Sequence, residues 1–336
     1  MTGAGRTAVL AGIGSCVPDR IVTNDDLART LDTSDAWIRT RTGVGERRFA
    51  DAGAATSDLA AAAGILALKS AGVAEVDLVL LATATPDRPC PATAPTVAAK
   101  MGLDTVAAFD LAAVCSGFVY GLAVAAAMIE SGRAQRLLLI AADTFSTILD
   151  PDDRTTMSVF GDGAGAVVLR AGTPDEPGAL GPVQLGSDGA LADMITVRAG
   201  GSEQRALGVL PDTADAYFRM AGKPVFMQAV ERMTAASLAV LRDAGRSIAE
   251  VDRLVGHQAN IRILHAVADQ LGIDRDKAVV HLDRVGNTAG ASIPLALADG
   301  WARGELRPGD CVLLTAFGGG ATWGASVLTW PELATP

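Results

Sequence analysis

Several segments of this chain occur twice in the same order, and this internal repeat limits the possible folds more than any other feature. The copies are offset by roughly 160 to 175 residues. Because their order is preserved, a duplication explains them better than the convergence of two similar αβ units. The matching pairs are 68-LKSAGVAEVDLVLL-81 with 241-LRDAGRSIAEVDRLVG-256, 97-VAAKMGLD-104 with 267-VADQLGID-274, and 160-FGDGAGAVVL-169 with 317-FGGGATWGASVL-328.

The repeated units predict an α/β fold. Each copy of the first segment fits a helix that ends at a glycine, Gly72 or Gly245, and is followed by a strand. Long apolar runs indicate strands that helices cover on both faces. We therefore predict two α/β halves, residues 1–172 and 173–336, packed around a pseudo-twofold axis with a site between them near the strand ends. The expected strands include 78-LVLLATA-84, 106-VAAFDLAA-113, 137-LLLIAA-142, 253-RLVG-256, 279-VVHLD-283 and 311-CVLLTAF-317, and a long helix is expected at 117–132.

Composition supports a globular chain. At 336 residues and 49% hydrophobic content it can bury a large core. The four cysteines form no CxxC pair, and no secretory signal is visible near the N-terminus. No run reaches the ~18 apolar residues needed to span a bilayer. We expect a reduced, cytosolic, soluble protein with no membrane association.

The net charge of −10 argues against nucleic acid as a general partner, because phosphate binding requires a basic field. A local basic patch is still compatible with this charge. The pair Arg47 and Arg48, preceded by Arg39 and Arg41, is one candidate. On charge alone, a solvated helix or loop face is an equal alternative.

Cys115 is the first candidate for chemistry. It follows the expected strand 106–113 and precedes the expected helix 117–132. A thiol at a helix N-terminus faces the positive end of the helix dipole and free N–H groups, so its pKa can fall toward neutrality. The same N–H groups can hold an oxyanion when the thiol attacks a thioester. Taken alone, a buried structural cysteine is the commoner case.

The repeat brings two further residues toward Cys115. In the second half, 285-VGNTAGASIPLAL-297 forms the corresponding strand-to-helix turn and carries Asn287. His257, at the end of the strand 253–256, takes the place of Ala82 or Thr83 in the first half. We therefore expect the cysteine, histidine and asparagine to converge on the pseudo-twofold axis.

The other two histidines have simpler interpretations. His265 lies in a helical pattern and is expected to be a surface or structural residue. His281 alternates within the expected strand 279–283, which is typical of a core or edge histidine with a hydrogen-bond partner. For His257, a structural histidine bonded to the backbone of a turn is the alternative to a catalytic role.

Three glycine-rich segments resemble nucleotide-binding loops only in part. Neither 318-GGGATWG-324 nor 161-GDGAG-165 has the lysine and Ser/Thr of a P-loop, and 12-GIGSCV-17 lacks the third glycine of a dinucleotide fingerprint. We expect all three to be tight turns between packed strands. No metal-ligand spacing is present, so no metal site is predicted.

With these residues on duplicated halves, the sequence resembles β-ketoacyl-acyl-carrier-protein synthase III of the thiolase superfamily. The resemblance covers nearly the whole chain and implies a homodimer of subunits with an αβαβα-layered, thiolase-like fold. The motifs that carry it are 34-SDAWIRTRTGVGERR-48, 115-CSGF-118, 160-FGDGAGAVVL-169, 217-YFRMAGKPVF-226, 257-HQANIRI-263, 286-GNTAGASIP-294 and 317-FGGGATWGA-325.

The resemblance also implies roles for residues at the reacting centre. Cys115 would be acylated by an acyl-CoA or acyl carrier protein in a ping-pong reaction, and the N–H groups of Cys115 and Gly319 would form the oxyanion hole. His257 and Asn287 would stabilise the enolate left when malonyl carrier protein loses CO2. Phe317 would desolvate the malonyl carboxylate.

Further roles follow for residues that bind the substrates. Trp37 and Arg41 match residues that sandwich the adenine of coenzyme A, and Arg154 matches another nucleotide contact. Asn260 would touch the pantetheine arm, and Arg262 would belong to a basic patch that meets the acidic carrier protein. Coenzyme A and phosphopantetheine thioesters are thus expected as substrates, with no permanently bound cofactor.

The sequence departs from the family pattern at three points. In the loop 83-TATPDRPCPATAP-95, Cys90 stands where the family often has an aromatic residue that closes the partner subunit's acyl pocket, so a deeper or wider pocket is expected. Thr155 stands where glycine is favoured, and the usual GNTSAAS reads 286-GNTAGAS-292.

These departures leave a second function open. Similar changes occur in variants from specialised metabolism that move a preformed acyl or aryl group to a carrier protein, hydroxyl or amine without condensation. Retention of His257 and Asn287 favours condensation, as in fatty acid or polyketide biosynthesis. A non-catalytic partner subunit is disfavoured, because such subunits usually lose one of the three polar residues.

Overall fold

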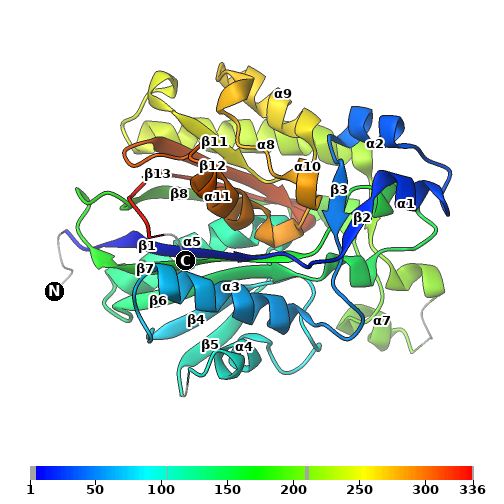
Figure 1. Ribbon diagram of the computed structural model, residues 1–336, viewed down its shortest axis with the longest axis horizontal. Helices are drawn as coiled ribbons and strands as arrows, with labels where there is room; N and C mark the ends of the chain where they lie inside the picture. The colour runs from blue at the N-terminus through cyan, green and yellow to red at the C-terminus, as the bar shows by residue number, and fades with distance from the viewer. Residues whose placement is uncertain (1–4, 104, 209–211, 335–336) are drawn as a thin grey trace.

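Two β-sheets form the centre of the molecule, and each sheet takes its strands from one half of the chain (Figure 1). The computed structural model describes residues 5–103, 105–208 and 212–334. The first sheet has the order β1-β7-β6-β4-β5, in which β4 runs parallel to β5 and β6, and β7 runs antiparallel to β6 and β1. Its strands are β1 (Thr7–Cys16), β4 (Leu78–Ala82), β5 (Ala107–Leu111), β6 (Arg136–Asp143) and β7 (Gly163–Gly172).

The second sheet has the order β11-β12-β13-β8, and these strands correspond to β4, β6, β7 and β1 of the first sheet. Strand β11 is parallel to β12, β13 is antiparallel to β12, and β8 is antiparallel to β13. The expected strand 279–283 is wrong: only an isolated parallel bridge between Leu254 and Ala278 stands where β5 lies in the first sheet. The chain then turns at His281 into a short helix. The strands are β8 (Leu180–Ser187), β11 (Arg253–Gly256), β12 (Cys311–Gly318) and β13 (Thr322–Thr329).

The duplication is visible in single hydrogen bonds. The Asp77 carboxylate accepts the N–H of Arg136 at 2.9 Å, and the Asp252 carboxylate accepts the N–H of Cys311 at 2.8 Å. Both aspartates belong to the repeated Ala-Glu-Val-Asp and tie the start of one parallel strand to its neighbour. The predicted duplication of two α/β halves is therefore confirmed. The predicted boundary after residue 172 falls between β7 and β8 and stays a prediction.

The predicted helix-ending glycines are also confirmed. Gly72 follows α3 (Thr56–Ser70) with a φ of 66°, and Gly245 follows α8 (Gly222–Asp243) with a φ of 65°. In this left-handed region a side chain costs free energy, so glycine is the suitable residue just beyond a helix. In each case a short connection leads to the strand that the repeat predicts, β4 from Leu78 and β11 from Arg253.

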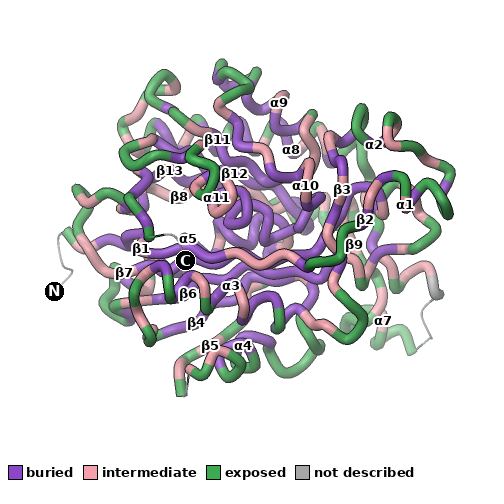
Figure 2. The backbone as a smooth tube through the Cα atoms, in the orientation of Figure 1, coloured by how far each residue is buried: buried purple, intermediate pink, exposed green. Residues whose placement is uncertain are grey.

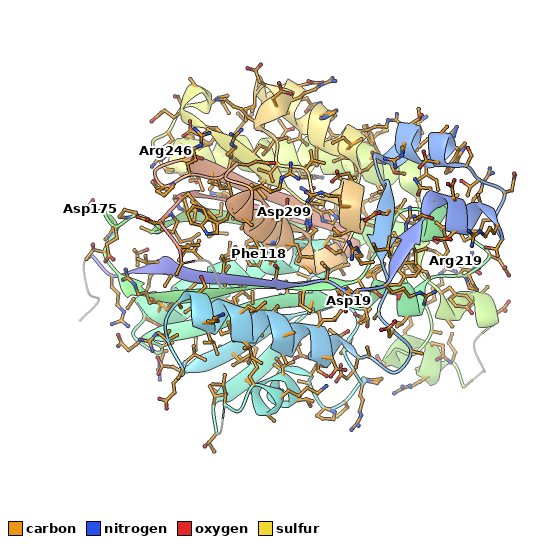
Figure 3. All side chains as sticks on the ribbon, viewed as in Figure 1. Asp19, Phe118, Asp175, Arg219, Arg246 and Asp299 are labelled. Atoms are coloured by element: carbon orange, nitrogen blue, oxygen red, sulfur yellow. The ribbon has the colours of Figure 1, made fainter. Side chains whose placement is uncertain are left out.

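Helices and sheets alternate in five layers. Helices α3 and α4 cover the outer face of the first sheet, and α8 and α9 cover the outer face of the second (Figure 1). Between the sheets lie α5 and α11, whose apolar residues share one core with both sheets. Phe118 of α5 lies in this central layer, whereas Asp175, Arg219 and Arg246 lie toward the periphery (Figure 3). The predicted αβαβα fold is confirmed.

Burial follows the layers. Residues along the central strands are buried, and exposed residues lie mainly in the outer loops and on the outer helix faces (Figure 2). Within the described residues, no helix is both long and apolar enough to cross a membrane. The remaining helices are α1 (Asn24–Ala28), α2 (Asp35–Thr42), α4 (Ala94–Lys100), α5 (Gly117–Glu130), α6 (Arg154–Met157), α7 (Ser202–Ala206), α9 (Ile261–Leu271), α10 (Leu282–Val285) and α11 (Ser292–Ala302); the short strands are β2 (Ile21–Thr23), β3 (Glu46–Arg48), β9 (Ile195–Thr196) and β10 (Arg219–Met220).

The glycine-rich segments have different structures. Segment 318–324 turns from β12 into β13, as expected. Segment 161–165 instead leads from the region after α6 into β7. The expectation for 12–17 is wrong, because Gly12 and Gly14 lie inside β1. A Cβ atom on Gly12 would lie 2.6 Å from the carbonyl oxygen of Ala67, so glycine here lets α3 approach the strand closely.

Candidate active site

Cys115, His257 and Asn287 line a single cavity between the two halves. All three residues are buried. The cavity is narrow, with a volume of about 30 Å³, and its remaining lining is mainly apolar, including Phe317, Phe160 and Phe218. The convergence predicted from the repeat therefore exists in the structure.

Cys115 lies in the 3-10 turn η1 (Val114–Ser116), directly before α5. Val114 has a φ of 46°, an unusual conformation for a β-branched residue. The second half repeats this turn as η7 (Ala289–Ala291) before α11, and Ala289 has a φ of 47°. The backbone position that matches Cys115 is thus Gly290, and Asn287 lies three residues earlier in the same turn.

The thiol of Cys115 is protonated in this environment. Burial raises the pKa of Cys115 most, and the negative charge of Asp143 raises it further. The N–H of Cys115 itself lowers the pKa but does not offset the two other effects. This is opposite to the fall toward neutrality expected from the helix dipole. Loss of solvation outweighs the dipole because the sulfur has little access to water.

His257 is held by Ser292, the first residue of α11. Its Nδ1 lies 2.6 Å from the Oγ of Ser292, and the same Oγ accepts the N–H of Gln258 at 3.3 Å. A hydroxyl that accepts from Gln258 can give its own proton to Nδ1, which places the imidazole proton on Nε2. Burial lowers the pKa of His257 to about 3, so the ring is neutral. His257 therefore offers an Nε2–H donor to the cavity.

Asn287 is fixed through its backbone and its amide oxygen. Its N–H donates to Val159 at 2.8 Å, and its carbonyl accepts the N–H of Gly161 at 2.9 Å. Its Oδ1 accepts the N–H of Ala289 at 2.9 Å. With Oδ1 engaged, the Nδ2–H group is the part of the side chain left for a ligand in the cavity.

Gly318 and Gly319 lie next to the cysteine turn. A Cβ atom on Gly318 would come within 2.8 Å of the Cys115 nitrogen, and one on Gly319 within 3.0 Å of the Val114 side chain. The end of β12 can approach the N–H of Cys115 this closely only without a side chain. Sequence analysis gave Gly318 only a place in a tight turn, and the structure brings its backbone into close contact with the backbone of Cys115.

A second cavity leads from the surface to the first. It has a volume of about 410 Å³, and Trp37 and Arg41 line it, whereas Cys115 does not. The two cavities adjoin, because they share part of their lining, and together they are called the channel below. The shared residues are Met220, Val225, Ala259, Ile263 and Asn287.

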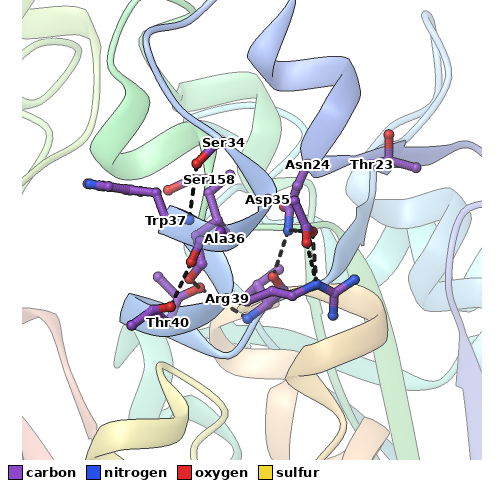
Figure 4. Close-up of polar contacts among 12 residues, drawn as sticks. Thr23, Asn24, Ser34, Asp35, Ala36, Trp37, Arg39, Thr40 and Ser158 are labelled. Atoms are coloured by element: carbon purple, nitrogen blue, oxygen red, sulfur yellow. Dashed lines mark hydrogen bonds and ion pairs between the residues drawn. The ribbon is translucent and has the colours of Figure 1, made fainter.

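Trp37 is flanked by two guanidinium groups at the channel mouth. The Cζ of Arg41 lies 4.6 Å from the centroid of the Trp37 ring, and the Cζ of Arg154 lies 5.1 Å from it. Helix α2 presents this ring, and Ser34 caps the helix by accepting the N–H of Trp37 (Figure 4). A flat, electron-rich ring beside two cations suits an aromatic ligand that carries phosphates.

Asn260 and Arg262 lie on the other side of this mouth. Asn260 caps α9, and its Nδ2 donates to the carbonyl of Arg41 at 2.9 Å. Arg262 is exposed, with its Cζ 5.7 Å from the ring centroid of Phe226. The channel mouth therefore carries positive charge on an otherwise acidic protein.

Arg47 does not belong to this positive surface, contrary to the expected patch. Its side chain is fully buried and donates to the carbonyls of Val22 and Ser158 and to the Oδ1 of Asn24. Asn24 in turn donates to Asp35, the first residue of α2 (Figure 4). Arg47 is thus a structural residue beneath the channel mouth.

Two predictions concern residues outside the cavities. Cys90 is exposed and lines neither cavity of its own chain, so its predicted role in a partner's pocket stays a prediction. His281 is buried and lies 3.9 Å from Asp299, although it is not in a strand.

Across residues 5–103, 105–208 and 212–334, no cluster of three or more His, Cys, Asp or Glu side chains could hold a metal ion.

Sequence reasoning missed two residues that support the site. Ser292 appeared only as the last letter of a motif, yet it orients His257. Asp143 ends β6 and is fully buried beside the cysteine turn. A polar residue at the end of a buried strand was the available signal for Asp143.

Comparison with known proteins gives consistent matches. A family model described as 3-oxoacyl-[acyl-carrier-protein (ACP)] synthase III matches residues 109–189, and the model of its C-terminal part matches residues 241–330. The chain is 61% identical over 333 residues to β-ketoacyl-[acyl-carrier-protein] synthase III 5 of Streptomyces coelicolor, covering 99% of each chain.

Solved structures agree with these matches. The crystal structure of 3-oxoacyl-(acyl carrier protein) synthase III, FabH, from Pseudomonas aeruginosa PAO1 is similar with a TM-score of 0.92 and 49% identity, covering 98% of this chain and 100% of that chain. The priming β-ketosynthase from the R1128 polyketide biosynthetic pathway is similar with a TM-score of 0.90 and 33% identity, covering 100% of this chain and 99% of that chain.

Proposed function

This chain belongs to the 3-oxoacyl-[acyl-carrier-protein] synthase III family, and we propose that it is an acyltransferase that performs decarboxylative condensation. It takes an acyl group from acyl-CoA or acyl carrier protein onto Cys115 and joins this group to malonyl carrier protein. Such a step begins a fatty acid or polyketide chain, as in the relatives named above.

One observation carries the proposal: a cysteine at a helix start shares an apolar cavity with two neutral N–H donors. Condensation needs a nucleophile that carries the acyl group and a separate pair of donors for an enolate. Cys115 supplies the first, and His257 Nε2 and Asn287 Nδ2 supply the second. The channel to Trp37 supplies an approach for a long thioester arm.

In the first half-reaction, the sulfur of Cys115 attacks the thioester carbonyl of the donor. A new C–S bond forms, the donor's C–S bond breaks, and the proton from Cys115 leaves with the departing thiol. Because the Cys115 pKa is raised, the proton is released during attack rather than before it. The N–H groups of Cys115 and Gly319 stabilise the transient oxyanion.

In the second half-reaction, malonyl thioester binds with its carbonyl oxygen against His257 and Asn287. The bond to the carboxylate breaks, CO2 leaves, and the electron pair forms an enolate that the two donors stabilise. The enolate carbon attacks the acyl group on Cys115, the C–S bond to the cysteine breaks, and the thiolate that leaves takes up a proton from water. Phe317 keeps water from the carboxylate and so favours loss of CO2.

The substrates also account for the channel mouth. Trp37, Arg41 and Arg154 hold the nucleotide of coenzyme A, and Asn260 contacts the pantetheine arm. Arg262 attracts the acidic carrier protein, which reconciles a local positive surface with a net charge of −10. Coenzyme A is a substrate in this proposal, and the enzyme has no resident cofactor.

The enzyme acts as a homodimer in the cytosol. Strand β5 lies at the edge of the first sheet, and its Phe109 is 39% exposed although it is a large apolar side chain. An uncovered edge strand favours pairing with a second copy. The loop carrying Cys90 would then reach the partner's cavity. A reducing compartment keeps Cys115 free to react.

The test is to incubate the protein with a series of acyl-CoAs and acyl carrier proteins and to measure mass added at Cys115. Malonyl carrier protein is then supplied, and CO2 and the ketoacyl product are followed. The proposal expects acylation that C115A abolishes, followed by both products. Acylation without CO2 release would instead support simple acyl transfer, and acylation that survives in C115A would overturn the mechanism.

A further inference from the structure

Asp143 is a buried carboxylate that bridges the two halves of the fold. It ends β6 and has no exposed surface. Its Oδ1 accepts the N–H of Ala84 at 2.7 Å and the hydroxyls of Thr83 and Thr85 at 3.2 Å each. Its Oδ2 accepts the N–H of Gly290, in the other half, at 2.9 Å. No lysine, arginine or histidine takes part in these contacts.

The duplication shows what position Asp143 occupies. Strands β6 and β12 match residue for residue, so Asp143 corresponds to Gly318. Gly290 likewise corresponds to Cys115, because each follows a left-handed residue in matching turns. The pair Asp143–Gly290 is therefore the second-half counterpart of the pair Gly318–Cys115.

The two matching turns differ in what lies beside the N–H groups of Cys115 and Gly290. At the turn of Cys115, the backbone of Gly318 lies so close that a Cβ atom would come within 2.8 Å of the Cys115 nitrogen, so β12 offers no side-chain acceptor to this N–H. At the turn of Gly290, the carboxylate at the end of β6 accepts the N–H. One turn thus has its N–H free of any side chain from the neighbouring strand, and the matching turn has its N–H bonded to a carboxylate.

The bond to Gly290 acts on a residue of the active site. Gly290 is the middle residue of η7, and the residue before it, Ala289, donates its N–H to the Oδ1 of Asn287. A fixed η7 therefore fixes which atom of the Asn287 amide turns toward the cavity. The same carboxylate also holds Ala84, which packs beside Cys115.

We propose that Asp143 is a positioning residue: by accepting the N–H of Gly290, its carboxylate holds η7 so that the Asn287 amide presents Nδ2 to the substrate. The inference rests on the proposed function, since it assigns Asn287 to the second half-reaction. It predicts that Asp143 matters more for condensation than for acylation of Cys115.

The test compares D143N with D162N as a matched control. Asp162 is also fully buried and accepts hydrogen bonds from Ala50 and Ser146, but its carboxylate has no bond to η7 or to residues 83–85. The two half-reactions are measured separately, as acyl mass on Cys115 and as CO2 release from malonyl carrier protein. We expect D143N to lower the second rate relative to the first by about tenfold or more, and D162N to leave the ratio unchanged.

A second readout separates positioning from general stability. Iodoacetamide labelling of Cys115 is followed against pH in the intact protein. Cys115 is the titratable group facing Asp143, whose other neighbours are hydroxyls and N–H groups. D143N removes the nearby negative charge, so the labelling profile should move to lower pH, whereas D162N should not move it.

If D143N does not fold, T83V carries the same comparison. It removes one hydroxyl donor and keeps the carboxylate, so a smaller loss of about threefold in the condensation-to-acylation ratio is expected. Equal ratios in the parent, D143N and T83V, or an equal loss in D162N, would overturn the proposal. Failure of the parent to acylate Cys115 with any donor would instead refute the proposed function.

Discussion

The Oγ of Ser292 lies 2.6 Å from the Nδ1 of His257 and also accepts the N–H of Gln258. In this arrangement the hydroxyl can donate its own proton to Nδ1, which places the imidazole proton on Nε2. A single hydroxyl at the start of α11 therefore determines whether His257 donates or accepts a hydrogen bond in the active site.

Substitution of Ser292 tests this relationship. S292A should leave acylation of Cys115 largely intact and slow condensation by about tenfold or more, because His257 loses its fixed tautomer. The measurement is the rate of ketoacyl product formation from preacylated enzyme. S237A is the matched control, since the Oγ of Ser237 is buried without a hydrogen-bond partner. Equal rates in S292A and the parent would contradict the assignment.

Gly318 should be intolerant of even a methyl group. G318A places a Cβ within 2.8 Å of the Cys115 nitrogen, although the extended backbone at Gly318 itself accepts any residue. We expect acylation of Cys115 to fall by about a hundredfold, the effect of losing an oxyanion donor. Mass spectrometry of the acyl adduct measures this. G189A, which meets no atom within 4 Å, should acylate normally.

Neighbouring arginines on α2 should have different effects on substrate binding. Arg41 faces the Trp37 ring at the channel mouth, whereas Arg39 is paired with Asp35 away from it. R41A should raise KM for acyl-CoA by about tenfold with little change in kcat, because it removes a contact made equally in the ground and transition states. R39A should leave KM unchanged, and an equal rise in both variants would show a general effect on α2.

Stability should fall as the solution becomes mildly acidic. Burial lowers the pKa of His257 to about 3 and that of His281 to about 4, below their ordinary value of 6.5. Above pH 6.5 both states of the protein carry neutral histidines, so nothing is lost. Below pH 6.5 the unfolded chain binds protons at these histidines and the folded chain does not. The free energy of unfolding therefore falls by about 1.4 kcal/mol per pH unit for each histidine.

Urea unfolding of the parent and H281Q measures this effect. The variant should lose less stability than the parent as pH falls from about 7.5 to about 5.5, since one of the two histidines is gone. Burial raises the pKa of Asp143 to about 6, which opposes the trend at the acidic end in both proteins equally. Parallel pH dependences would show that His281 does not titrate as inferred.

Cys90 should control the range of acyl donors across the proposed dimer. C90F restores a large side chain in the loop 83–95 and should narrow the donors toward short chains, because the partner's pocket becomes smaller. The relative rates of Cys115 acylation by short and long acyl-CoAs measure this. The control is C90S, which changes the exposed Cys90 without adding a large side chain. An unchanged donor range in C90F would show that the loop does not line the pocket.

The repeat predicted the main features of the fold because these features depend on local sequence patterns that both copies share. Helix-ending glycines such as Gly72 and the strands that follow them depend on neighbours in sequence, and they are where the pattern places them. The meeting of Cys115, His257 and Asn287 followed from matching turns and not from any one motif.

The failures depend on contacts between distant segments. Arg47 is buried because its acceptors come from Val22, Asn24 and Ser158, which no charge pattern reveals. Gly12 lies within a strand because α3 packs closely against it. The apolar run 279–283 has strand composition, but it gains only the bridge at Ala278 before the chain turns.

Val114 and Ala289 both hold a left-handed backbone conformation, although only the first precedes a nucleophile. Such a conformation costs about 1–3 kcal/mol for a residue with a side chain. Glycine at Val114 would adopt this conformation without that cost. It would also loosen the backbone directly before the nucleophile. Stability and reactivity are thus set against each other at this turn.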